Sequence, residues 1–268
     1  MGPYECELGW RYVRAGRSGR RNRFISFISL ASIAGIALGV AALIVVLSVM
    51  NGFERVVRER MLGVIAHLEV ADAGGAGLAD PQALAARALR VPGVVAAAPF
   101  VAGEALLGRG DALRGVLLAG IDPPAQARVT PLAARLLAQG TLAPLAPGAR
   151  RIVLGAELAR QLDARAGDAV TLVLPPAAGG AGALPRLVRF TVAGTFEAGH
   201  YEYDSMLAYL DLADAAEALG FAGPNELQLA LADPDSAPAV ARAVGASLGP
   251  GFAVRDWTRT NRTWFEAL

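Results

Sequence analysis

The chain has 268 residues, of which 54% are hydrophobic and 18% charged, and its formal net charge at pH 7 is +1. This near-neutral balance argues against a protein that binds nucleic acid by bulk electrostatics, so we expect no nucleic-acid partner. The single cysteine, Cys6, excludes an intramolecular disulfide framework and a multi-cysteine metal site.

An uncharged apolar run extends from Ile25 to Val49. At about 1.5 Å per residue it is long enough to cross the hydrocarbon core of a bilayer, and it predicts a transmembrane helix over residues 24–50. A secretory signal peptide is the alternative. Its apolar core would be only about 7 to 15 residues long, with a cleavage site of small residues after it. The charged sequence NGFERVVRERM follows instead, so we expect a permanent anchor.

Arginines are distributed unevenly around this run. Three follow it, mixed with glutamates, whereas six precede it. Because cytoplasmic flanks carry the excess of basic residues, we expect residues 1–23 in the cytoplasm and residues 51–268 on the other side of the inner membrane. The six preceding residues are Arg11, Arg14, Arg17, Arg20, Arg21 and Arg23.

Gly35 and Gly39 form a G-x-x-x-G pair within the run. Small residues at this spacing let a second helix approach closely, so they predict a helix-packing site. Glycine and alanine are common in membrane spans, and a plain anchor stays open as the alternative.

After residue 63 the chain alternates strand and helix patterns. The order suggests two lobes, in which a strand-rich lobe, about 95–220, is inserted between a first strand-helix unit and a last strand-helix-strand unit. We therefore expect an α+β domain on one N-terminal transmembrane helix. The expected strands are 64–71, 94–107, 115–121, 151–154, 168–174, 186–196, 205–210, 226–231 and 252–257, and the expected helices are 81–90, 131–139, 155–162, 211–220 (capped by Asp211) and 235–248.

Residues with catalytic or metal-binding chemistry are few. His67 and His200 lie far apart and have no cysteine near them, so we expect no metal site. The segment HYEYDS (200–205) brings together His, Asp and Ser, but a triad depends on contacts in space, and we interpret the segment as a hydrogen-bonded loop. No phosphate-binding loop is present, so we expect no cofactor and no ATP bound by this chain.

Longer stretches resemble a known family. The N-terminal NRFISFISLASIAGIALGVAALIVVLSVMNGFERVVRERMLGVIAHLEV is similar to the start of the lipoprotein-releasing ABC transporter permeases, the LolC/LolE family. The resemblance covers essentially the whole chain. It continues in LAGIDP (118–123), IVLGAELARQL (152–162), GDAVTLVLP (167–175), FTVAGTFEAGHYEYDS (190–205) and the final WFEAL.

This resemblance implies a MacB-like periplasmic domain and a permease subunit, without enzymatic activity of its own, in a complex that extracts outer-membrane lipoproteins from the inner membrane. The implied partners are a second permease subunit (LolE-type) or a second copy, a cytoplasmic ATPase dimer (LolD-type), a periplasmic chaperone (LolA-type) and the lipoproteins. The helical pattern passes through Asn51 and Gly52. In the light of the resemblance, this continuous helix would be a stiff lever that passes movement of the periplasmic domain to the membrane, whereas a Gly/Ser linker would be too flexible to do so.

The resemblance also implies site residues on the first span. Val46 and Met50 would contact the acyl chains of the lipoprotein, with Leu43, Leu47 and Phe53 as neighbours at helical spacing. Methionine is flexible and polarizable, which suits a variable lipid surface. Ordinary lipid-facing packing is the alternative.

Between the paired strands lies PPAAGGAGALP (175–185), at the position of the hook that binds the chaperone in the LolC-type subunit or in a fused type. A flexible hairpin connection is the alternative. The residues implied in the hook and its base are Pro175, Pro176, Ala177, Leu184, Pro185, Arg186 and Arg189.

The family continues after WFEAL into further membrane spans and a coupling helix, so we expect a truncated permease. Three other hypotheses stay open. They are an export permease of the MacB type, a membrane-anchored periplasmic binding module, and an anchored hydrolase that uses HYEYDS.

Overall fold

The computed structural model describes residues 4, 7, 8, 11, 20–75, 77–174 and 185–260. The chain divides into two compact units, residues 1–58 and 59–268. Helix α2 (Arg20–Leu62) contains 43 residues and passes through Asn51 and Gly52 without interruption, as the sequence predicts.

The apolar part of α2, Phe27–Gly52, has a mean hydropathy of 2.7, and none of it is buried. Among the described residues it is the one helix long and apolar enough to cross a membrane. Its length and composition agree with the expected N-terminal transmembrane helix.

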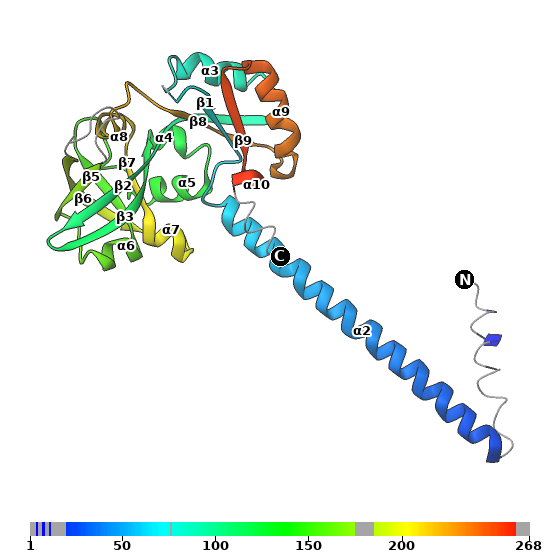
Figure 1. The fold of residues 1–268 in the computed structure, drawn as a ribbon. Coiled ribbons are helices and arrows are strands. Elements are labelled where there is room, and N and C mark those ends of the chain that lie inside the picture. The colour runs from blue at the N-terminus through cyan, green and yellow to red at the C-terminus, as the bar shows by residue number, and fades with distance from the viewer. Residues whose placement is uncertain are drawn as a thin grey trace. The chain divides into compact units, whose positions relative to one another are not determined.

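In the second unit, four strands form an antiparallel sheet in the order β2-β8-β1-β9. Helices α3 and α9 cover one face of this sheet (Figure 1), and their apolar side chains share one core with those of the strands. The chain order, strand-helix-strand twice, is that of a split βαβ fold. The elements are β1 (Leu68–Asp72), α3 (Pro81–Ala88), β2 (Val94–Arg109), β8 (Glu226–Leu231), α9 (Ala237–Leu248) and β9 (Phe252–Asp256).

Six strands close on themselves in the order β2-β3-β7-β4-β6-β5, because β5 pairs back onto the second half of β2. Alternate side chains, such as Leu107, Leu172 and Phe190, fill the interior. Closure removes free edges from this part of the sheet. The additional strands are β3 (Ala112–Ile121), β4 (Arg151–Gly155), β5 (Ala169–Leu174), β6 (Arg186–Phe196) and β7 (Leu207–Asp211).

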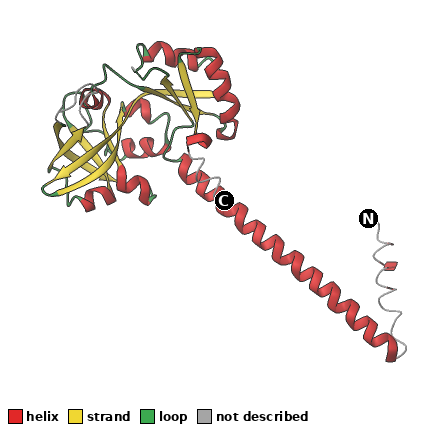
Figure 2. Ribbon diagram, in the orientation of Figure 1, coloured by secondary structure: helices red, strands yellow, loops and turns green. Residues whose placement is uncertain are grey.

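Short helices lie beside both the six-stranded and the four-stranded part of the sheet (Figure 2). Asp211 caps one of them by accepting a hydrogen bond of 2.8 Å from the Ala213 N–H, as predicted. These elements are α4 (Pro123–Gln126), α5 (Pro131–Ala138), α6 (Ala156–Gln161), α7 (Tyr201–Met206), α8 (Leu212–Leu219), the 3₁₀ helix η1 (Pro234–Ser236) and α10 (Trp257–Thr260).

The predicted α+β fold class is confirmed, and two element predictions are wrong in part. The first strand begins at Leu68 and not at residue 64, because Val64 and Ala66 pack in clusters with residues of α5 and α4. The predicted strand 205–210 begins at Leu207, the first residue that pairs with β3. The preceding segment, expected to be a loop, is helix α7, in which the Asp204 N–H donates to the His200 carbonyl.

Candidate functional site

One face of α2 carries the residues that the sequence singles out on this helix. At about 100° per residue, positions 35, 39, 43, 46, 47, 50 and 53 fall within an arc of about 120°. Four of these side chains are between 48% and 62% exposed, while only the backbone is described at Phe53. The four are Leu43, Val46, Leu47 and Met50.

The glycine pair lies at the N-terminal end of this face. A Cβ atom added at Gly35 or Gly39 would meet no other heavy atom within 4 Å. The backbone is therefore open to close approach at the glycines, whereas larger apolar side chains cover the same face from Leu43 onward. One face thus offers a packing surface and an apolar contact surface in succession along the helix.

The second predicted site lies at the end of the β5–β6 hairpin. Leu174 pairs with Arg186, so the intervening residues connect the two strands at this end. Pro185, Arg186 and Arg189 are described. The remaining predicted hook residues, Pro175, Pro176, Ala177 and Leu184, lie outside the described residues.

The two arginines at the hairpin base differ in their surroundings. The Arg186 guanidinium donates to the backbone carbonyls of Glu217, at 2.5 Å, and of Ala218, both in the last turn of α8. A cation there satisfies free carbonyl groups and complements the helix dipole. Arg189 is exposed on the outer face of β6, where it pairs with Thr171 of β5. Arg186 is thus part of the scaffold, and Arg189 is accessible to a partner.

An apolar row lies on the outer face beside the same hairpin. Leu106 of β2 lies opposite Val173 of β5, which lies opposite Leu187 of β6. Residues directly opposite each other share one face of a sheet. Leu106 and Leu187 are 42% and 65% exposed, so apolar surface borders the loop that carries the predicted hook. Alternation along β6 points Leu187 outward.

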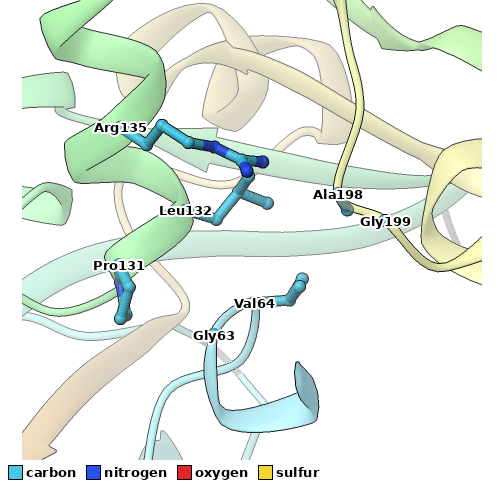
Figure 3. A pocket seen from close by; sticks show the side chains of 7 residues that line it. All are labelled: Gly63, Val64, Pro131, Leu132, Arg135, Ala198 and Gly199. Atoms are coloured by element: carbon cyan, nitrogen blue, oxygen red, sulfur yellow. The ribbon is translucent and has the colours of Figure 1, made fainter. Parts of the chain in front are cut away.

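A cavity of about 420 Å³ opens directly after α2 (Figure 3). Gly63 and Val64 form one wall and residues of α5 another, including Leu132, whose N–H donates to the Gly63 carbonyl at 2.9 Å. Among the described residues that line it, Arg135 is the one ionisable residue, and its guanidinium donates to the Glu197 carbonyl at 2.5 Å. These described lining residues supply no acid–base pair or nucleophile.

The HYEYDS segment does not form a catalytic relay. The Asp204 carboxylate accepts from the Ala198 N–H at 2.6 Å, and the Ser205 hydroxyl donates to the Glu202 carbonyl at 3.0 Å. The His200 ring meets Tyr203 edge to face. Because the serine and the aspartate each bind backbone, the hydrolase hypothesis has no support from this geometry. Among the described residues, no three His, Cys, Asp or Glu side chains gather as a metal site requires.

A pair of carboxylates that sequence patterns did not reveal lies on the four-stranded sheet. Arg255 of β9 approaches Glu226 of β8 at 2.9 Å and Glu69 of β1 at 3.8 Å. Burial, followed by the charge of Glu69, raises the pKa of Glu226 to about 7. Burial also raises the pKa of Glu69. One arginine thus serves two carboxylates that strand pairing brings together.

Burial has the opposite consequence at His67, where it lowers the pKa of the imidazole. The Nδ1 atom accepts a hydrogen bond of 2.8 Å from the Leu231 N–H. His67, the residue before β1, therefore holds this end of the strand to β8 as a neutral side chain, and its role is structural.

Comparison with known proteins shows the family to which the chain belongs. Residues 29–247 match the family described as the MacB-like periplasmic core domain. The chain is 41% identical over its whole length to the lipoprotein-releasing system transmembrane protein LolC of Xylella fastidiosa, of which it spans 64%. It is 36% identical to LolE of Haemophilus influenzae over 52% of the chain and 33% of that protein.

A structural likeness is also found to the periplasmic region of MacB from Actinobacillus actinomycetemcomitans. It covers 78% of this chain and 96% of that region, at 13% identity and a TM-score of 0.42. The chain spans 64% of the length of each of three LolC relatives.

Proposed function

We propose that this chain, which belongs to the family with a MacB-like periplasmic core domain, is a LolC-type permease subunit of an ABC transporter that extracts lipoproteins from the inner membrane. The observation that carries the proposal is the 41% identity to LolC along the whole chain. The match to LolE of Haemophilus influenzae covers about half of the chain. Neither a MacB-type exporter nor a separate binding module accounts for the match to LolC.

The proposed topology has residues 1–23 in the cytoplasm, a span over residues 24–50 and the domain 51–268 in the periplasm. The excess of arginine before the span supports this orientation. The proposed complex also contains a LolE-type subunit or a second copy, and a cytoplasmic LolD-type ATPase dimer that hydrolyses ATP.

The proposed lipid contact is the face of α2 with Leu43, Val46, Leu47, Met50 and Phe53. An apolar, exposed helix face is a suitable surface for acyl chains, and Met50 can adapt to chains of different shape. Gly35 and Gly39, earlier on the same face, would bring a neighbouring helix close at one end of this lipid contact.

The proposed chaperone contact is the loop 175–185 with the surface beside it. The apolar row Leu106, Val173 and Leu187 and the exposed Arg189 lie on the outer face next to the loop. A lipid-binding chaperone of the LolA type could contact apolar and charged groups there together. The lipoprotein would pass from the face of α2 to this partner.

Photo-crosslinking in cells tests the lipid contact. A photoreactive amino acid is placed at Val46 or Met50 in the complete permease subunit, and a matched control places it at Val45, which points away from the proposed face. All three side chains are exposed. We expect lipoprotein adducts at Val46 and Met50 that are at least about tenfold stronger than at Val45, since neighbouring positions differ by about 100°. Equal labelling at the three positions would contradict the assignment.

A further inference from the structure

A groove on the six-stranded part of the domain has no role in the proposed function. Its volume is about 560 Å³, within the range of about 300 to 1,000 Å³ found for ligand sites. The walls come from α3, β2, α4, the end of α5 with the chain after it, and the start of α8. The rigid and apolar part of the lining consists of Pro99, Pro123, Pro124, Pro147, Leu142 and Leu145.

Two carboxylates, Asp122 and Asp211, enter this groove from neighbouring parallel strands. Ile121, the last residue of β3, pairs with Asp211, the last residue of β7. Asp122 follows Ile121 directly, so both aspartates lie at the same end of the two strands, where α4 and α8 begin. Diverging elements at the carboxyl ends of parallel strands leave a crevice that is a common place for ligands.

The two side chains differ in what they contact. Asp211 is buried and accepts from the Ala213 N–H, and its pKa is raised by burial and, to a smaller extent, by the charges of Asp214 and Asp122. Asp122 is exposed and does not accept from the first turn of its own helix, unlike Asp80 and Asp233 at their helix starts. Within the described part of the chain, no ion pair is recorded for Asp122 or Asp211.

The described residues that line the groove include two carboxylates and no arginine, lysine or histidine. A negative charge between apolar walls is complementary to a cation with an aliphatic stem, since the stem packs on the walls and the head group meets the carboxylates. We propose that this groove binds an extended segment of a partner protein that carries one arginine or lysine between apolar residues.

The groove is less suited to other occupants. A calcium ion takes about six to eight oxygen ligands, more than the two carboxylates that line this groove supply. An anionic group would be repelled. The site is independent of the acyl-chain face and of the β5–β6 hairpin, so its failure would leave the proposed function in place.

The test uses the full chain in lipid nanodiscs and a fluorescein-labelled peptide, LPLRLPL, followed by fluorescence anisotropy. A second peptide replaces the arginine by citrulline, which keeps the shape and removes the charge. We expect saturable binding of the arginine peptide, and binding of the citrulline peptide about tenfold weaker. Partition of the probe into lipid affects both peptides equally.

Three variants locate the binding. Asp122→Asn, an isosteric change at an exposed position, should remove the tenfold preference for arginine. Ala143→Trp, at an exposed position in the lining, should block both peptides, and Asp111→Asn in the β2–β3 turn should change neither affinity. The proposal is overturned if no saturable binding occurs at millimolar peptide, if citrulline binds as well as arginine, or if Asp122→Asn has no effect. Self-association of the chain that Asp122→Asn abolishes would overturn it in favour of a second copy.

Discussion

Individual residues in this domain are shaped by contacts that sequence neighbours do not supply. Glu226 is an example, because the pattern ELQLAL predicts that it lies in a strand but does not predict that it lies close to Glu69 and Arg255. The structure puts the buried carboxylate of Glu226 and the half-buried carboxylate of Glu69 within reach of one guanidinium. Glu226 therefore has a consequence for the pH dependence of stability.

Replacing Glu226 by Gln tests that consequence. The pKa of Glu226 is raised from 4.5 to about 7 in the folded chain, so between these values the folded state holds a proton that the unfolded state has lost. Its contribution therefore makes the wild type less stable as the pH rises from 5 to 8. The wild type should lose up to about 3 kcal/mol in its free energy of unfolding over this pH range through Glu226. Glu226→Gln removes this loss, so at pH 8 the variant should be the more stable chain.

Urea unfolding at several pH values, followed by circular dichroism, measures this difference. Glu104→Gln, at an exposed strand position, is the matched control and should parallel the wild type. A Glu226→Gln variant that is less stable than the wild type at pH 8 would show that the ion pair with Arg255 outweighs the cost of burying the charge.

Glycines at two positions show the same dependence on distant parts of the chain. A Cβ atom at Gly155 would lie 2.3 Å from the Asp204 carbonyl oxygen, and one at Gly120 would lie 2.4 Å from the Ala215 side chain. Each glycine allows a helix to approach a strand closely. Neither reason can be read from the local sequence.

Among the elements, the β5–β6 hairpin carries two arginines with different roles, one structural and one accessible to a partner. Arg186 binds the last turn of α8, whereas Arg189 points outward in the next row of the same strand pair. The two arginines stand three residues apart and looked equivalent in the sequence. The register and the position of α8 distinguish them.

Paired substitutions should separate the two roles. Arg186→Gln removes a charge-assisted contact to helix carbonyls, so we expect a loss of about 1 kcal/mol in the free energy of unfolding. Arg189→Gln should leave stability within about 0.5 kcal/mol of the wild type, since it lies on the surface. It should weaken binding of the periplasmic chaperone several-fold.

Binding is measured by surface plasmon resonance with the full chain in nanodiscs, and stability by urea unfolding of the same samples. Unchanged chaperone binding in Arg189→Gln would remove this side chain from the proposed contact. Unchanged stability in Arg186→Gln would show that water replaces the guanidinium at the end of α8.

At the scale of the whole molecule, helix α2 carries the chain through Asn51 and Gly52 without a break. Glycine costs about 1 kcal/mol of helix propensity relative to alanine, and the helix nonetheless continues to Leu62. If lipoprotein release depends on movement passing along this helix, stiffness at Gly52 is required. A flexible linker would absorb such movement.

Inserts after Gly52 in the complete permease subunit test this requirement. A seven-residue helical insert, EAAAKAA, adds about two turns and nearly restores the facing of the helix, whereas GSGSGSG has the same length and is flexible. We expect the flexible insert to lower transfer of lipoprotein to the chaperone in proteoliposomes at least about tenfold more than the helical insert. Equal losses would show that length, and not stiffness, matters.

The sequence by itself determined the features that depend on neighbours along the chain. The apolar run predicts the candidate span, alternation predicts most strands, and Asp211 marks the start of α8. Sequence resemblance also identified the family. These signals are readable because helix and strand periodicities and caps act over a few residues.

Only the tertiary structure decided how distant segments meet. Closure of six strands, the end of β7 beside Asp122, the partner of Arg186 and the Glu69–Glu226–Arg255 cluster all depend on pairing between residues far apart in the chain. The helix Tyr201–Met206 was missed for the same reason, since the strand after it begins where β3 provides a partner. Register and packing are properties of the whole sheet, and no local pattern contains them.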